Sequence, residues 1–122
     1  MAGLVLELDA AAAEPGEPIT GTVRWTGRMT VFEVALRWET RGKGDKDKLT
    51  VATKTVQVAD REATEARFEL TAPHQPFSFS GELISLTYYV RAEDADTDTG
   101  HGWFEAEIVI APGGKEVRLA GA

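Results

Sequence analysis

Three aspartates towards the C-terminal end have the spacing that comes closest to a site of defined chemistry. Asp94, Asp96 and Asp98 alternate with small residues, and Glu105 stands at the twelfth position counted from Asp94. This pattern is typical of a calcium-binding loop, which also needs a glycine at its sixth position for a sharp turn. The sixth position here is Thr99. We therefore interpret the segment as an acidic hairpin tip, keep the three aspartates as secondary metal candidates, and expect no metal or cofactor.

The other reactive residue types lack the arrangement that catalysis needs. The chain has two histidines, His74 and His101, and no cysteine, which excludes thiolate nucleophiles and cysteine-based metal sites. Ser78, Ser80 and Ser85 have neither a nucleophile-elbow motif nor a following helix, and the glycine-rich pieces lack the spacing of a phosphate loop. The sequence therefore predicts a protein that is not an enzyme.

Aromatic side chains on the surface are the remaining candidates for a binding site. Because successive residues of a strand point to opposite faces, Trp25 and Trp38 are expected to point inward, whereas Tyr89 and Trp103 stay on the surface. Exposed aromatic residues are enriched at protein interfaces. We predict Tyr89 and Trp103 as interface residues, with a carbohydrate- or calcium-binding module as the alternative function.

Length and charge narrow the class of protein further. The 122 residues suit a single domain spanning residues 1–122, and their 43% hydrophobic content is that of a folded protein. Twenty acidic against 13 basic residues give a net charge of −7, which disfavours nucleic acid and favours a basic partner. We find no apolar stretch long enough to span a membrane and no targeting signal, so the cytoplasm is the expected location.

The segments that must position these residues read as strands. Apolar and polar residues alternate with a period of two along most of the chain, which indicates sheets with one buried and one solvated face. This alternation predicts an all-β fold, a two-sheet antiparallel β-sandwich of the immunoglobulin-like or arrestin-like kind with 7–8 strands. The one place where a helical turn is expected is Ala10–Glu14. The predicted strands lie around residues 4–9, 19–25, 32–39, 48–58, 65–70, 84–91, 104–110 and 117–119.

One hairpin is defined closely enough to predict its facing pairs. A turn at residues 96–100 places Arg91 opposite Glu105 and Tyr89 opposite Glu107 on the solvated face. The residues that alternate with them then point into the core.

Three segments resemble the arrestin-type sandwich. Residues 68–90 contain an F-x-L strand, a proline-bearing corner, an S-F-S-G step and a strand ending in Y-Y-V. Residues 15–23 are similar to the P-G-E-x-I-x-G-x-V second strand of that family, and residues 36–45 resemble its central strand and Gly-Asp loop. The matches occur in the family's order and run over nearly the whole chain.

The resemblance implies a fold and a general role. The family includes arrestins, the arrestin-like retromer subunit and bacterial sporulation-control proteins, which are mostly two tandem sandwiches that bind other proteins. This chain has room for one sandwich, so the resemblance implies no interdomain groove and no phosphate-sensing residue. We expect a non-catalytic adaptor, scaffold or small regulatory protein that binds an unidentified protein, or a second copy of itself through an edge strand.

Overall fold

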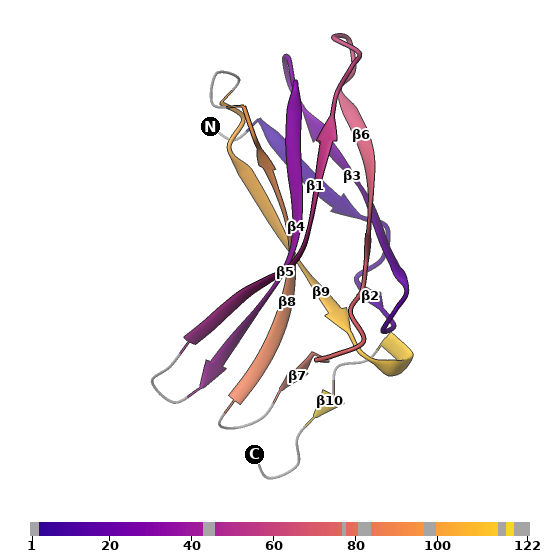
Figure 1. The fold of residues 1–122 in the computed structure, drawn as a ribbon, viewed down its shortest axis with the longest axis vertical. Helices are drawn as coiled ribbons and strands as arrows, with labels where there is room; N and C mark the ends of the chain where they lie inside the picture. The colour runs from indigo at the N-terminus through magenta and orange to yellow at the C-terminus, as the bar shows by residue number, and fades with distance from the viewer. Residues whose placement is uncertain are drawn as a thin grey trace.

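Two β-sheets pack face to face, as Figure 1 shows. The computed structural model describes residues 3–42, 46–76, 78–80, 84–96, 100–114 and 117–118. The smaller sheet has the strand order β1-β3-β6, with both pairs antiparallel. Its strands are β1 (Leu4–Leu8), β3 (Pro18–Trp25) and β6 (Glu65–Thr71).

The larger sheet follows the order β10-β7-β8-β4-β5, and β9 also pairs with β8. Its centre is the β4–β8 pair, and in the described part of the chain β5 pairs with β4 alone. A short 3-10 turn, Pro112–Gly114, follows β9. The strands are β2 (Ala12–Ala13), β4 (Val31–Gly42), β5 (Lys46–Gln57), β7 (Phe79–Ser80), β8 (Ile84–Asp94), β9 (Trp103–Ile110) and β10 (Val117–Arg118).

This architecture confirms the predicted all-β sandwich. Among the described residues, seven strands have five or more residues, and each coincides with one of the alternating segments of the sequence. The helical turn expected at Ala10–Glu14 is wrong, because Ala12 and Ala13 form a short strand parallel to the end of β9. No helix in the described residues combines the length and the apolar character that crossing a membrane requires.

The core lies between the inner faces of the two sheets, and the alternation in the sequence selects its members. Tyr88 and Val90 are fully buried, as the hairpin parity predicted. The Tyr88 hydroxyl donates a hydrogen bond of 2.9 Å to the carbonyl oxygen of Pro76, so burial leaves it satisfied. Burial also raises the pKa of Tyr88 to about 12. The other large core residues are Leu4, Leu6, Ile19, Val23, Trp25, Phe32, Val34, Leu36, Phe68, Leu70, Leu86, Ile108 and Ile110.

The two tryptophans predicted to point inward differ. Trp25 is buried and donates a 3.0 Å hydrogen bond from Nε1 to the carbonyl oxygen of Ala63. Trp38 packs against the core but is only partly buried. Trp38 stands on β4 just after the register shift between Leu36 and Arg37.

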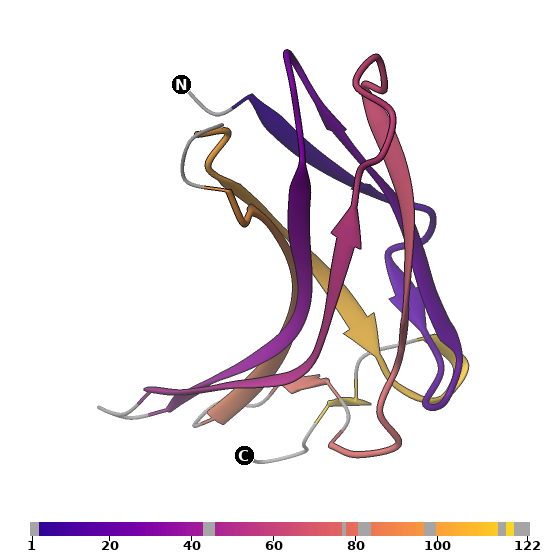
Figure 2. The same cartoon turned by 45° about the horizontal axis from the view of Figure 1, so that its top comes forward.

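That bend gives the larger sheet a concave outer face. The far ends of β4, β5 and β8 swing away from the smaller sheet, as Figure 2 shows. The β4–β5 register shifts between Leu36 and Arg37, where Leu36 faces Ala52 and Arg37 faces Thr50. An extra residue in one strand bends it and increases its twist, so this β-bulge accounts for the curvature.

Candidate interaction site on the larger sheet

Strand register gathers charged and aromatic side chains on the outer face of the larger sheet. Tyr89 of β8 faces Arg37 of β4 on one side and Glu107 of β9 on the other. The next row along β8 joins Arg91 to Glu105 of β9. Both facing pairs predicted for the hairpin are therefore confirmed.

A hollow of about 290 Å³ lies on this face and brings the two predicted interface residues together. Tyr89 and Trp103 line the same hollow, although they stand in different strands. A neighbouring hollow of about 240 Å³ shares Arg37 and Arg91 with it. The charged side chains that line the larger hollow are Arg37, Glu39, Lys48, Arg91 and Glu105.

Trp103 lines the hollow together with Trp38 and Tyr89, and it is the most exposed large hydrophobic residue in the described part of the chain, at 51%. The guanidinium carbon of Arg91 lies 4.2 Å from the centre of its ring. A cation over an aromatic face is attracted by the ring quadrupole, so the arginine and the indole hold each other in place. The result is a fixed aromatic surface that stays half open to solvent.

The ion pairs on this face are long. Arg37 Nη1 lies 3.4 Å from Glu105 Oε2, and Arg91 Nη2 lies 3.7 Å from Glu93 Oε2. Charge-assisted hydrogen bonds at full strength are shorter than this, at about 2.7–2.9 Å. Burial raises the pKa of Tyr89, an effect that nearby Arg41 opposes and nearby glutamates reinforce. The hydroxyl of Tyr89 therefore keeps its proton at neutral pH.

The outer face of the smaller sheet carries ion pairs of a different kind. Arg67 binds both carboxylate oxygens of Asp9, and the hydroxyl of Thr20 donates to the same carboxylate at 2.6 Å. Arg24 Nη1 lies 2.8 Å from Glu7 Oε2. The hydrogen bonds from Arg67 and Thr20 hold the pKa of Asp9 well below its usual range. These arginines are engaged within the protein at close to optimal geometry.

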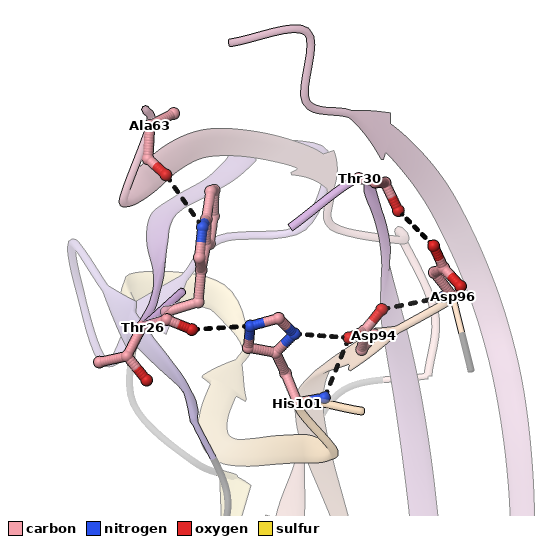
Figure 3. Close-up of polar contacts among 7 residues, drawn as sticks. Thr26, Thr30, Ala63, Asp94, Asp96 and His101 are labelled. Carbon is pink, nitrogen blue, oxygen red and sulfur yellow. Dashed lines mark hydrogen bonds and ion pairs between the residues drawn. The ribbon is translucent and has the colours of Figure 1, made fainter. Parts of the chain in front are cut away.

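The hairpin that carries the aspartates has a structural arrangement of its own, shown in Figure 3. Asp94 Oδ2 accepts hydrogen bonds from the backbone N–H of His101 at 3.0 Å and lies 2.7 Å from its Nδ1. His101 Nε2 lies 2.8 Å from the carbonyl oxygen of Thr26, and the Asp96 carboxylate accepts a bond from Thr30 at 2.7 Å. The buried ring of His101 thus joins the end of β8 to the loop after β3.

Sequence reasoning missed this junction because Thr26, one partner of His101, is 75 residues away in the chain. Asp98, the third of the aspartates kept as metal candidates, lies outside the described residues. Among the residues that the structure describes, no group of three or more histidines, aspartates or glutamates is arranged to hold a metal ion. His74 is exposed beside Gly16, which has a φ of 82°.

The geometry of the two sheets defines a class of fold that solved structures share. The sporulation control protein Spo0M from Bacillus subtilis matches with a TM-score of 0.62 and 17% identity over 88% of this chain and 48% of its own. Squid arrestin matches with a TM-score of 0.61 and 13% identity over 98% of this chain and 51% of its own. No protein-family model matches the sequence, and no curated protein matches it significantly.

The chain therefore has an arrestin-like fold, as its sequence motifs predicted. It spans about half the length of each of these two structures. At this level of identity the likeness concerns the fold, so the function must be argued from the site itself.

Proposed function

We propose that residues 1–122 form a non-catalytic protein-interaction module, an adaptor, scaffold or small regulatory protein of the cytoplasm. Its partner protein binds the concave outer face of the larger sheet. The observation that carries this proposal is the hollow in which Tyr89 and Trp103 meet Arg37 and Arg91. Aromatic residues and arginine dominate binding energy at protein interfaces, particularly where neighbouring groups exclude water.

The chemistry of the hollow supports binding rather than catalysis. Its lining holds no histidine, and the carboxylates of Glu39 and Glu105 each lie beside an arginine of the same face.

A sheet edge is the second surface that supports partner binding. Strand β5 has twelve residues, and in the described chain it pairs only with β4. Leu49 and Val51 on this strand are 50% and 36% exposed. An unpaired edge can accept a strand from another chain, including a second copy of this one. We therefore retain a homodimer through β5 as the alternative mode of association.

The two other candidate ligands are a sugar and calcium, and fewer structural observations support them. A sugar could use the pair Tyr89 and Trp103, since both line one hollow. Calcium binding would have to compete for Asp94, whose carboxylate binds His101 and the backbone N–H of Asp96. A thermal shift with micromolar calcium and a glycan array test these two alternatives directly.

The proposal is tested by capturing partners from native extract with three forms of the chain. The wild type is compared with Trp103→Ala, and with Val5→Ala as a matched control, since Val5 is a 46% exposed apolar residue on β1 of the other sheet. A partner retained by wild type and Val5→Ala but lost by Trp103→Ala supports the proposal. Equal capture by all three forms overturns the assignment to this face. Recovery of the chain alone, as a dimer on sizing, replaces the adaptor role with self-association.

A further inference from the structure

The arginines of the concave face do not engage all of their N–H donors in hydrogen bonds within the protein. A guanidinium offers several N–H donors in a planar fork that matches a carboxylate in a bidentate arrangement. Arg67 on the smaller sheet achieves that arrangement with Asp9. Arg37 and Arg91 instead approach their glutamates at 3.4 and 3.7 Å. Both retain donor capacity, and both side chains are about a quarter exposed, at 25% and 26%.

The lining of the larger hollow and the chain as a whole have net charges of opposite sign. Its lining contains three cationic side chains, Arg37, Lys48 and Arg91, and two carboxylates, Glu39 and Glu105. The chain as a whole carries a net charge of −7. Within a Debye length of about 10 Å, the local charges decide what the hollow attracts. The lining of the larger hollow has one more cation than carboxylates, whereas Glu33 and Glu93 in the neighbouring hollow and Glu107 opposite Tyr89 add negative charge around it. An acidic group is therefore favoured where it lies directly between Arg37 and Arg91.

We propose that this hollow binds an acidic, extended segment of a partner protein. A carboxylate of the segment lies between Arg37 and Arg91, and an adjacent apolar side chain packs on Trp103 and Tyr89. This inference rests on the proposed function and adds the chemical class of the partner. The arginines supply charge-assisted hydrogen bonds, and the half-exposed indole supplies the apolar contact.

The neighbouring hollow restricts which acidic segments fit. Glu33 and Glu93 face each other across β4 and β8 and line the smaller hollow beside the same two arginines. A second carboxylate of the partner would meet these like charges there, which is unfavourable. The site therefore selects one carboxylate next to an apolar residue and discriminates against an uninterrupted run of acidic residues.

The inference is tested with three blocked peptides of equal length that share two phenylalanines. Their remaining positions alternate serine with glutamate, with lysine, or with serine alone. Binding to the full chain is followed by NMR through the indole N–H of Trp103 and the backbone amides of Arg37 and Arg91. We expect the glutamate peptide to shift these signals at about millimolar concentration or below, and the lysine and serine peptides to shift them little.

Three variants at Arg37 and Arg91, with one control variant on the other sheet, locate the carboxylate. Arg37→Gln and Arg91→Gln should each weaken binding of the glutamate peptide at least about tenfold, since each removes a charge-assisted hydrogen bond. Arg24→Gln on the smaller sheet is the matched control and should leave binding unchanged. Thermal melting verifies that each variant is folded, and Arg91→Lys, which keeps the charge but loses the planar fork, should bind with intermediate affinity.

The outcomes separate this inference from the proposed function. Preference for the lysine peptide, or no shift at Trp103 with the glutamate peptide, overturns the acidic partner. If capture of a partner still depends on Trp103 in that case, the interaction module stands with a different ligand class. Binding of the glutamate peptide that is equally strong in Arg37→Gln and Arg91→Gln overturns the site. Binding at the site without any captured partner leaves the ligand class supported and the adaptor role contradicted.

Discussion

The two outer faces of the sandwich use the same residue types to different ends. On the smaller sheet, Arg67 and Asp9 form a closed bidentate pair, and Thr20 adds a further bond to the carboxylate. On the larger sheet, Arg37 and Arg91 are held at longer distances above a hollow. A saturated network contributes to the fold, whereas an unsaturated one keeps donors available for a partner. The comparison teaches that contact geometry, and not the number of charges, distinguishes arginines engaged within the protein from arginines that retain donor capacity.

Substitutions at the Asp94–His101 contact, which joins the two sheets, should lower the free energy of unfolding more than substitutions on either outer face. Asp94→Ala removes the carboxylate that lies within hydrogen-bond distance of the backbone N–H and the buried ring of His101, and we expect a loss of about 3 kcal/mol in the free energy of unfolding, because buried polar groups that lose a hydrogen-bond partner are destabilising. Urea denaturation measures the loss. The adjacent variant Glu93→Ala, at an exposed position of β8, is the matched control and should change stability by less than about 0.5 kcal/mol. Equal effects of the two variants would show that the junction is not structural.

The second-largest effect on stability is expected at Gly21 of β3, where β1 and Phe68 approach its backbone closely. A Cβ atom added at Gly21 would lie 2.6 Å from the carbonyl oxygen of Glu7 and 2.7 Å from the ring of Phe68. We expect Gly21→Ala to lower stability by about 2 kcal/mol, since β1 or Phe68 must shift to make room. Phe68→Leu relieves one of these contacts, so the double variant should be more stable than the sum of the single changes predicts. Strict additivity in thermal melting would contradict this packing.

The closed pair on the smaller sheet should give the stability of the protein a pH dependence. The pKa of Asp9 is lower in the folded chain than its unfolded value of about 3.9, so its carboxylate stabilises the fold above that pH. This stabilisation is lost as the pH falls below about 4. Urea denaturation at low and at neutral pH gives the free energy of unfolding under each condition. The difference between the two values should be smaller for Asp9→Asn than for wild type. Arg67→Gln removes the main partner and should reduce the difference to the part that the hydrogen bond from Thr20 contributes; an unchanged difference would assign the effect to another group.

The open pairs on the larger sheet should contribute least to stability. We expect Arg37→Gln and Glu105→Gln each to change the free energy of unfolding by no more than about 0.5 kcal/mol, because partly exposed pairs at these distances are weak. A double-mutant cycle in urea isolates the interaction between the two side chains. A coupling well above about 1 kcal/mol would make the pair structural and would remove the distinction between the two faces.

Much of the larger sheet could be predicted from alternation alone. The pairing of Arg91 with Glu105 and of Tyr89 with Glu107 follows from the position of one turn, because each step along a strand reverses the side that a residue faces. The inward position of Tyr88 follows in the same way. Alternation did not predict β2, since Ala12 and Ala13 pair with β9 through contacts that no local pattern encodes.

The sequence predicted which residues belong to the candidate site but not how they are arranged. Surface parity selected Tyr89 and Trp103 one at a time, yet separate positions along the hairpin gave no sign that both would line one hollow. The register of β8 with β9, in which Tyr89 faces Glu107 and Trp103 faces Glu93, places both side chains on the same outer face. His101 is buried because Thr26 and Asp94 supply acceptors from two distant segments.

The amino-acid sequence by itself determined which side chains face the interior, because the period-two geometry of a strand is local to each segment. It also determined the class of fold, since half-polar strands are stable only when two sheets cover each other's apolar faces. The tertiary structure alone decided which outer face is curved, which arginines are saturated and which histidine is buried. Those properties depend on register, bulges and contacts between residues far apart in the chain, and no local pattern contains them.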